Sequence, residues 1–266
     1  MKTNATILGG GNLGSALAQG LARTELARQK YNVTVTRRNV ELIKPLENLG
    51  ITVTSDNIEA VKGAKLLILA VQPTQIEALI EEIRPALNAT KHILISTITG
   101  LKNEEIAKLT GDNFPIIRVM PNTAAAINQS MTCVEKTPHD EAEQATVELF
   151  DMLGKTLLIN AELMEASTVL GACGIAFFLR YIRAASQGGI EVGFHANEAQ
   201  LIAAQTALGA AGLLLESGGH PEQEIDKVTT PKGCTIAGLN EMEHNGLSSA
   251  LIKGIKISYE MIDKIR

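Results

Sequence analysis

The sequence predicts an α/β domain with a doubly wound sheet over residues 1–160, followed by an all-α domain over residues 161–266. Short, nearly continuous apolar runs alternate with helical patterns in the first part, and 66–71 is the clearest run. Such runs are typical of parallel strands that are covered on both faces. After residue 160 the strand signal ends, and alanine, glycine and leucine recur at helical spacing.

Eight strands are expected in the first part, at residues 4–9, 32–36, 51–54, 66–71, 92–97, 115–119, 131–135 and 156–160. An apolar stripe that Pro85 closes predicts a helix between two of them, and it consists of Ile76, Leu79, Ile80 and Ile83. Another helix is expected to begin with Thr137 as its N-cap and Pro138 at its first position, and to end at Gly154.

The second part is expected to hold helices at residues 162–172, 175–193, 197–217, 222–228, 235–243 and 247–265. Gly218 and Gly219 end the third of these helices, and Pro221 opens the fourth. The many small residues predict close helix packing, either in a self-contained bundle or in one half of an interlocked dimer. The scarcity of large aromatic side chains favours the dimer.

Composition and charge exclude several classes of protein. The 266 residues carry a formal net charge of −5, which gives no electrostatic footprint for nucleic acid. No apolar run approaches the roughly 20 residues that span a bilayer, and the N-terminus runs directly into the first strand, so neither a membrane segment nor a signal peptide is expected. Cys133, Cys173 and Cys234 lie far apart and the histidines are dispersed, which predicts no disulfide framework, no metal site and a cytoplasmic location.

A Gly-x-Gly-x-x-Gly turn at residues 9–14 follows the first strand and opens a helical pattern. Gly9 allows the tight turn, Gly11 allows the backbone to approach a pyrophosphate, and Gly14 allows the helix to lie against the strand. The helix N-terminus then faces the phosphates, because its free N–H groups and its dipole favour an anion. With a second strand at the expected distance, the turn predicts a Rossmann-type site for a dinucleotide.

The end of the second strand indicates which dinucleotide binds. NAD enzymes usually carry a carboxylate there, which binds the ribose hydroxyls. In this chain the first carboxylate after the second strand is Glu41. Arg37 and Arg38 occupy the position instead, and two guanidinium groups match a 2′-phosphate through charge-assisted hydrogen bonds. We therefore expect NADPH rather than NADH, with a solvated basic turn as the alternative.

Three further segments resemble the pyrroline-5-carboxylate reductases, which make proline. They are residues 70–73 (AVQP), 119–123 (VMPNT) and 228–239 (VTTPKGCTIAGL). The last is the most specific, because it resembles the family's signature stretch V-S/T-S/T-P-G-G-T/A-T-I. The resemblance covers nearly the whole chain in order and spacing. It implies reduction of 1-pyrroline-5-carboxylate to L-proline by hydride transfer from NADPH to the imine carbon, the last step of proline biosynthesis.

The resemblance also implies roles for individual residues. Residues that would bind the cofactor are Gly9, Gly11, Asn12, Leu13, Gly14, Arg37, Arg38, Asn57, Ala70, Val71, Gln72, Pro73, Asn122 and Thr123. Residues that would bind the substrate are Thr229, Thr230, Lys232, Gly233, Cys234 and Thr235. Thr235 would be catalytic, because its hydroxyl would hydrogen-bond the ring nitrogen. The site would lie between the cofactor crevice and the helical half, completed by the second subunit of a homodimer or higher homo-oligomer.

The loop before the expected helix at 235–243 supports a carboxylate site independently of the resemblance. Free backbone N–H groups at a helix start, with hydroxyl groups nearby, favour a carboxylate. A capped connection between two helices, with no ligand, is the alternative. Cys234 is expected to be a small packing residue, since the sequence shows no base paired with it.

Several positions depart from the family pattern. The run 171–177 retains only Gly174 and Ala176 of the family's S-G-S-G-P-A-Y stretch, and Gln72 replaces a lysine. Lys232 replaces the first glycine of the P-G-G run, where it either adds positive charge for the carboxylate or obstructs a conformation that glycine allows. A divergent branch, a shifted substrate and a lost activity all remain open.

Two other functions therefore stay open beside the reductase of 1-pyrroline-5-carboxylate. One is an NADP(H)-dependent reductase of another small imine or keto acid on the same architecture. The other is a regulatory protein that binds NADP(H) without turnover. Activity on a panel of imines and keto acids distinguishes the first alternative from the reductase of 1-pyrroline-5-carboxylate. Tight NADPH binding without NADPH oxidation would indicate the second.

Overall fold

The computed structural model describes residues 1–111, 113–262 and 264. The chain divides into two compact units. The first comprises residues 1–175 together with the described residues from 258 onward, and the second comprises Ala176–Ile257. The domain boundary predicted at residue 160 marks the change from strands to helices and stays a prediction. Residues 263, 265 and 266 of the predicted second domain lie outside the described residues.

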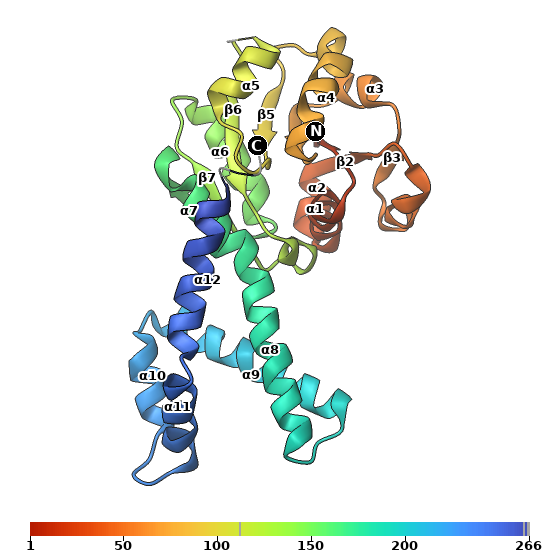
Figure 1. Ribbon diagram of the computed structural model, residues 1–266. Coiled ribbons are helices and arrows are strands. Elements are labelled where there is room, and N and C mark those ends of the chain that lie inside the picture. Colours follow the sequence, from red (N-terminus) through yellow and green to blue (C-terminus); the bar gives the residue numbers. More distant parts are fainter. Residues whose placement is uncertain (112, 263, 265–266) are drawn as a thin grey trace. The chain divides into compact units, whose positions relative to one another are not determined.

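One sheet forms the centre of the first unit (Figure 1). Its eight strands lie in the order β3-β2-β1-β4-β5-β6-β7-β8. The strands are β1 (Thr3–Leu8), β2 (Tyr31–Thr36), β3 (Thr52–Thr54), β4 (Leu66–Leu69), β5 (Ile93–Ser96), β6 (Ile116–Met120), β7 (Ser130–Glu135) and β8 (Gly154–Ile159). All eight predicted strands are confirmed, each within two residues at either end. From β3 to β6 every neighbouring pair is parallel, as the apolar runs predicted.

The prediction of a parallel sheet is wrong at one junction, where β7 pairs antiparallel with β6. Only residues 121–129 lie between these strands, and they hold the short 3-10 helix η5 (Thr123–Ile127). A parallel return needs a crossover of about a dozen residues or more, so the chain reverses direction instead. The longer connection from β7 to β8 contains a helix and allows a parallel pair again.

Helices cover both faces of this sheet. They are α1 (Asn12–Arg23), α2 (Glu25–Lys30), α3 (Asn57–Lys62), α4 (Ile76–Ile83), α5 (Asn103–Thr110), α6 (Asp140–Asp151) and α7 (Met164–Ser167). α1, α2 and α6 contribute to one core cluster, with Ile7 and Phe150, whereas α3, α4 and α5 contribute to another, with Leu8 and Ile80. Successive strand side chains point to opposite faces, so Ile7 and Leu8 enter different clusters. The doubly wound α/β class is thereby confirmed for β1–β6.

Helix α6 corrects the predicted positions of two boundaries. It begins at Asp140 with His139 as N-cap, not at Pro138 with Thr137. The hydroxyl of Thr137 accepts the N–H of His139 at 3.3 Å, so it stabilises the turn before the helix. Gly154 begins β8 rather than ending the helix, and a Cβ on it would lie 2.1 Å from the carbonyl oxygen of Ser130.

The segment predicted as one helix at 162–172 consists of three shorter pieces within the first unit. A 3-10 turn, η6 (Ala161–Leu163), leads into α7, and a π-turn at Thr168–Cys173 follows it. Periodicity alone did not separate these pieces, because the apolar side chains of 3-10, α and π turns recur at similar spacings.

The second unit is helical throughout its regular structure. Its helices are α8 (Gly174–Glu191), which begins in the first unit, α9 (Ala196–Ser217), α10 (Pro221–Val228), α11 (Cys234–His244) and α12 (Leu247–Ile262), which ends in the first unit. Gly218 ends α9 with a φ of 63°, and Pro221 is the first residue of α10, as predicted. Residues 263 and 265 of the predicted helix 247–265 lie outside the described residues.

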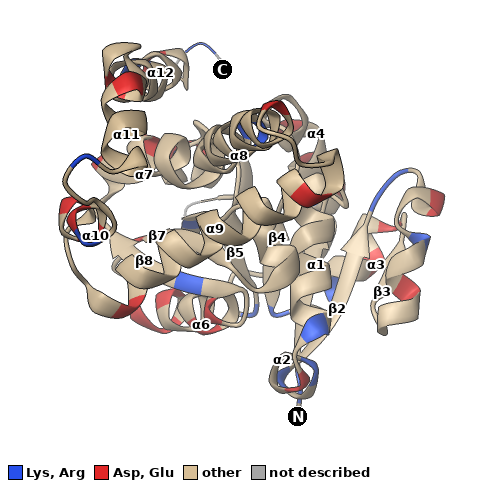
Figure 2. Ribbon diagram, turned by 90° about the horizontal axis from the view of Figure 1, so that it is seen from below, with Lys and Arg blue, Asp and Glu red and all other residues tan. Residues whose placement is uncertain are grey.

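Apolar side chains are widely exposed on this second unit. Helix α9 carries only two charged residues, Glu198 and Glu216, and is almost uniformly tan in Figure 2. Side chains more than 60% exposed include Phe178, Leu201, Leu208, Leu215 and Ile252. Such open apolar surface is typical of a face that meets another protein chain.

Two helical stretches, Ala161–Glu191 and Ala196–Ser217, are long and apolar enough to cross a membrane by length and composition alone. No uninterrupted apolar run of that length indicated them, because charged and polar residues break each run. A core helix of a soluble protein passes the same test.

His92 makes the stability of the first unit depend on pH. It precedes β5, is 1% exposed, and accepts the N–H of Asn88 through Nδ1 at 3.1 Å, while Nε2 has no partner among the described residues. Burial, and then the charge of Lys91, lower the pKa of His92 below its usual value of 6.5. The unfolded chain therefore takes up this proton more readily, so the stabilising contribution is fully present above pH 6.5 and is lost as the pH falls towards the lower folded pKa.

We expect the free energy of unfolding to fall between about pH 7 and about pH 5.5 with this group contributing to the slope. Urea unfolding of the wild type and of His92→Leu at both pH values measures it. The variant removes the titrating ring, so its stability should depend less steeply on pH. Equal slopes for the two proteins would contradict the assignment.

Candidate active site

The glycine loop lies at the edge of the sheet where the carboxyl ends of the parallel strands meet. The backbone N–H groups of Gly9 and Gly10 both donate to the carbonyl of Thr36 at the end of β2, at 3.2 and 2.7 Å. β1 has β2 on one side and β4 on the other, so the strand order reverses beside the loop. In open α/β sheets, ligands bind at this switch point.

The three glycines of the motif are small for different reasons: two are required by the packing of the protein itself, and one leaves open space. Gly9 has a φ of 114°, and a Cβ there would lie 2.5 Å from the carbonyl oxygen of Ala70. A Cβ on Gly14 would lie 2.1 Å from the carbonyl oxygen of Gly9. The protein's own packing therefore requires both residues. A Cβ on Gly11 would meet nothing within 4 Å, so its small size leaves space for a ligand.

Helix α1 begins directly behind this space. Gly11 is its N-cap, no side chain caps it, and its first turn contains no acidic residue. Its first N–H groups are therefore free to bind an anion. Asn12 is exposed at this position, whereas Leu13 is half-buried and packs against the core. These features fit the pyrophosphate of a dinucleotide.

Gly11→Ala tests this assignment without disturbing the fold. Because the new methyl group meets no protein atom, we expect the free energy of unfolding of the cofactor-free protein to stay within about 0.5 kcal/mol of the wild type. The methyl group would occupy the pyrophosphate space, so the Kd for NADPH should rise about tenfold or more, equivalent to about 1.4 kcal/mol. Calorimetric titration measures the affinity, and unchanged binding would contradict the placement of the pyrophosphate.

Arg37 and Arg38 follow β2 and have different surroundings. Arg37 is half-buried, and its Nη1 donates to the carbonyl of Gly10 at 2.6 Å while its backbone N–H donates to Thr54 at 3.1 Å. It therefore holds the glycine loop. Arg38 is exposed and forms no hydrogen bond or ion pair within the described part of the chain. Its guanidinium is free to bind a 2′-phosphate.

The segment after β4 lies against the glycine loop, and the cofactor-binding role of its residues stays a prediction. The carbonyl of Ala70 and a methyl group of Val71 are the nearest atoms to a Cβ placed on Gly9. Gln72 is exposed, and Pro73 begins a 3-10 turn, η3 (Pro73–Gln75). The backbone N–H of Gln72 donates to the side-chain oxygen of Gln75 at 3.2 Å, which closes this turn beside the glycine loop.

Asn57 has another partner in the structure. It is the first residue of α3, and its amide donates to both carboxylate oxygens of Glu82 on α4 at 3.0 Å. An adenosine contact from this side chain would have to replace the bond to Glu82, so its predicted role remains a prediction.

Asn122 and Thr123 lie after β6 at the same edge. Asn122 is 6% exposed and caps η5, since its Oδ1 accepts the N–H of Ala124 at 3.0 Å. Its Nδ2 donates to the carbonyl of Gly171 at 3.1 Å. Thr123 is exposed beside it. The sheet therefore brings these two residues to the edge that carries the glycine loop.

Sequence reasoning missed the segment after β5. β5 lies between β4 and β6, so residues 97–100 end at the same edge as the predicted cofactor residues. The hydroxyl of Thr97 donates to the carbonyl of Leu69 at 3.0 Å, and the hydroxyl of Ser96 accepts the N–H of Ile98 at 3.3 Å. Small hydroxyl residues followed by Gly100 after a buried strand were the signal that could have indicated it.

A buried ion pair lies between β6 and β7 and is hydrogen-bonded to neighbouring segments. Arg118 of β6 and Glu135 of β7 are 8% and 7% exposed, and the guanidinium donates to the carboxylate. Arg118 also donates to the carbonyls of Leu101 and Ala161, at 3.4 and 3.3 Å, and Asn103 donates to Glu135 at 3.1 Å. The pair therefore connects β6 and β7 with the segments that follow β5 and β8.

In the second unit, the predicted substrate residues form the loop between α10 and α11. The N–H of Gly233 donates to the carbonyl of Thr230 at 2.9 Å, which closes a turn. The hydroxyl of Thr229 donates to the backbone carbonyl of Asp226 at 3.2 Å. Gly233 is the N-cap of α11, no side chain caps this helix, and its first turn contains no acidic residue. Cys234 and Thr235 are exposed at the start of the helix.

The conformation of Lys232 decides whether this residue obstructs the backbone geometry that a glycine would allow. Its φ is 60°, so it adopts the left-handed conformation that glycine takes at no steric cost. The lysine therefore does not obstruct this conformation, although holding it costs about 1–2 kcal/mol. Its side chain is exposed and has no partner within the described residues.

The described residues offer donors and cations rather than a nucleophile. Burial raises the pKa of the thiols of Cys133 and Cys173, which disfavours the reactive thiolate. Within the described ranges, no group of three His, Cys, Asp or Glu side chains could hold a metal ion.

Comparisons with known proteins agree with both halves of the chain. Residues 161–265 match the family model described as pyrroline-5-carboxylate reductase dimerisation, and residues 4–100 match that of NADP oxidoreductase coenzyme F420-dependent. The chain is 47% identical to pyrroline-5-carboxylate reductase 1 of Dictyostelium discoideum over 95% of its own length, but spans only 48% of that relative. It is 44% identical to pyrroline-5-carboxylate reductase 2 of the same organism, over 98% of this chain and 92% of the relative.

Solved structures extend the likeness to three dimensions. The pyrroline-5-carboxylate reductase of Coxiella burnetii superposes with a TM-score of 0.87 at 26% identity, covering 100% of this chain and 99% of that one. The corresponding enzyme of Streptococcus pyogenes gives 0.84 at 26% identity, covering 99% of each chain. Since a relative is matched along nearly all of its length at 44% identity, the chain belongs to the pyrroline-5-carboxylate reductase family.

Proposed function

We propose that this protein reduces 1-pyrroline-5-carboxylate to L-proline with NADPH, the last step of proline biosynthesis. The observation that carries the proposal is the segment 229–235, which consists of the loop before helix α11 and the first two residues of that helix. It keeps the family's hydroxyl residues at a helix start that no side chain caps and whose first turn has no acidic residue. The names of the curated relatives support it, and the glycine loop with an open position at Gly11 supports the cofactor.

The carboxylate of the substrate would bind at the start of α11. Its free N–H groups, the helix dipole and the ammonium group of Lys232 all favour a negative charge there. The hydroxyl of Thr235 would donate to the ring nitrogen and favour the developing amine. NADPH would supply the hydride, and the residues of the chain would orient the imine carbon towards it.

The cofactor would lie along the strand edge of the first unit. The N-terminus of α1 would bind the pyrophosphate, and Arg38 would bind the 2′-phosphate that separates NADPH from NADH. A structure of Plasmodium falciparum pyrroline carboxylate reductase with NADP bound shares this fold, with a TM-score of 0.85 at 21% identity.

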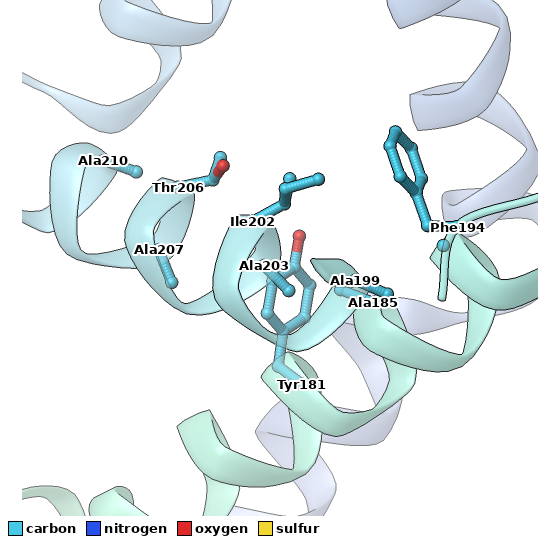
Figure 3. A pocket seen from close by; sticks show the side chains of 10 residues that line it. Tyr181, Ala185, Phe194, Ala199, Ile202, Ala203, Thr206, Ala207 and Ala210 are labelled. Atoms are coloured by element: carbon cyan, nitrogen blue, oxygen red, sulfur yellow. The ribbon is translucent and has the colours of Figure 1, made fainter. Parts of the chain in front are cut away.

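We further propose a homodimer, or a higher homo-oligomer, formed through the helical unit. The dimerisation model matches this part of the chain, and its helices expose large apolar side chains. α8 and α9 also border a cavity of about 300 Å³, lined by Tyr181, Phe194, Ile202 and several alanines (Figure 3). A second copy would cover these surfaces. Three free cysteines accord with a reducing cytoplasm as the location.

The decisive experiment measures NADPH consumption with racemic 1-pyrroline-5-carboxylate and identifies the product as proline. The same assay with a six-membered cyclic imine and with a keto acid tests the alternatives. A clear preference for either of them would replace the proposed substrate. Tight NADPH binding by calorimetry with no oxidation on any substrate would instead indicate a regulatory protein.

A further inference from the structure

The π-turn Thr168–Cys173 is bonded to the strand edge by one side chain. Asn122, after β6, donates from Nδ2 to the carbonyl of Gly171 within this turn at 3.1 Å. Both residues belong to the first unit, which extends to residue 175. Helix α8 begins at Gly174, directly after the turn, and carries the chain out of this unit. The bond therefore lies where the chain leaves the cofactor-binding half.

Asn122 is itself fixed by its other polar groups. Its Oδ1 accepts the N–H of Ala124 at 3.0 Å, and its carbonyl accepts the N–H of Ala125 at 3.1 Å. Its backbone N–H donates to the hydroxyl of Ser130 at 3.1 Å, and Ser130 is hydrogen-bonded to Thr132 at 3.1 Å. Asn122, Ser130 and Thr132 are buried, so the amide that reaches Gly171 is held in one orientation.

The bond reaches a stretch of the chain that has few polar side chains of its own. Residues 171–177 contain no serine, threonine or proline, so neither a local hydroxyl group nor a proline ring defines the start of α8. π-turns are rare, and a side chain that inserts at the hydrogen-bond ladder of a helix is one cause of such irregularity. Here that side chain belongs to Asn122, which follows β6 at the edge that carries the glycine loop.

We propose that Asn122 is a positioning residue that acts through Gly171. Its amide fixes the π-turn, and the π-turn fixes the start of α8. The part of this inference that concerns catalysis rests on the proposed function, whereas the structural link does not. Loss of the link loosens residues 171–177 and slows turnover, while the cofactor still binds.

Asn122→Ser tests the link, because serine retains a cap for η5 but is too short to reach Gly171. Asn122→Asp is the second variant, since its carboxylate accepts from Ala124 but donates nothing. Gly171→Ala is the matched control: its carbonyl is retained, and a Cβ there meets nothing within 4 Å. Hydrogen exchange at residues 171–177 should accelerate about tenfold or more in both Asn122 variants, and in the control it should not accelerate.

Kinetics then distinguish positioning from cofactor contact. We expect the Kd for NADPH to stay within about threefold of the wild type, and kcat/KM for 1-pyrroline-5-carboxylate to fall about tenfold or more. Unchanged exchange at 171–177 overturns the proposal, and so does a loss of NADPH affinity that matches the loss of kcat/KM. If the wild type turns over no imine, the proposed function fails, while the exchange measurement still decides whether Asn122 holds the π-turn.

Discussion

Thr235→Ala lowers kcat/KM for 1-pyrroline-5-carboxylate about 10²-fold, the scale of losing one donor to a developing charge. Thr235 is the second residue of α11, is exposed, and its hydroxyl has no partner within the described residues. The substitution therefore removes no contact that stabilises the fold. Steady-state kinetics with NADPH measure the effect, and thermal unfolding of the variant should match the wild type.

Thr235→Ser is the control for this prediction. Serine keeps the hydroxyl and loses one methyl group, so kcat/KM should stay within about threefold of the wild type if the donor is what matters. A kcat/KM for Thr235→Ala equal to that of the wild type would remove Thr235 from the mechanism. Equal losses in the alanine and serine variants would assign the effect to packing rather than to the hydroxyl.

Arg38→Ala raises the Kd for NADPH about 10- to 100-fold and leaves that for NADH unchanged. A hydrogen bond to a charged group contributes about 1.5–3 kcal/mol, and only NADPH carries the 2′-phosphate. Arg38 is exposed and has no partner within the described part of the chain, so its loss affects nothing else. Titration of both cofactors measures the ratio, and an unchanged ratio would refute the assignment.

Arg37→Ala gives a different pattern, although the two arginines are neighbours. Arg37 already donates to the carbonyl of Gly10 at 2.6 Å, so removing it loosens the glycine loop that we propose as the pyrophosphate site of either cofactor. We expect NADPH and NADH to bind more weakly together. Selective loss of NADPH binding would mean that Arg37 turns to the phosphate and releases Gly10.

Local patterns predicted most of the first unit. A parallel strand that is covered on both faces reads as a continuous apolar run, and β4 (Leu66–Leu69), which is buried at every position, is the clearest example. The glycine motif could be predicted as well, because a Cβ on Gly9 or Gly14 would collide with a neighbouring backbone carbonyl. These features depend on neighbours in the chain or on one adjacent strand, and the sequence states them directly.

Some local features and those that depend on distant residues could not be predicted from the sequence patterns. The reversal at β7 follows from the short connection after β6, and the start of α6 follows from the turn that Thr137 and His139 form. The bond between Asn122 and Gly171 joins residues that are 49 positions apart. The bond between Asn57 and Glu82, which competes with the predicted adenosine contact, also crosses between two helices.

The sequence by itself determined the class of fold, the glycine loop and the family. Each of these can be recognised from the residue pattern of short segments, whose local conformation does not depend on the rest of the chain. The tertiary structure alone decided which arginine is free, that Lys232 takes a left-handed conformation, and that a buried asparagine holds the π-turn. Those facts follow from which groups already have partners, and partners are assigned only when distant segments are packed together.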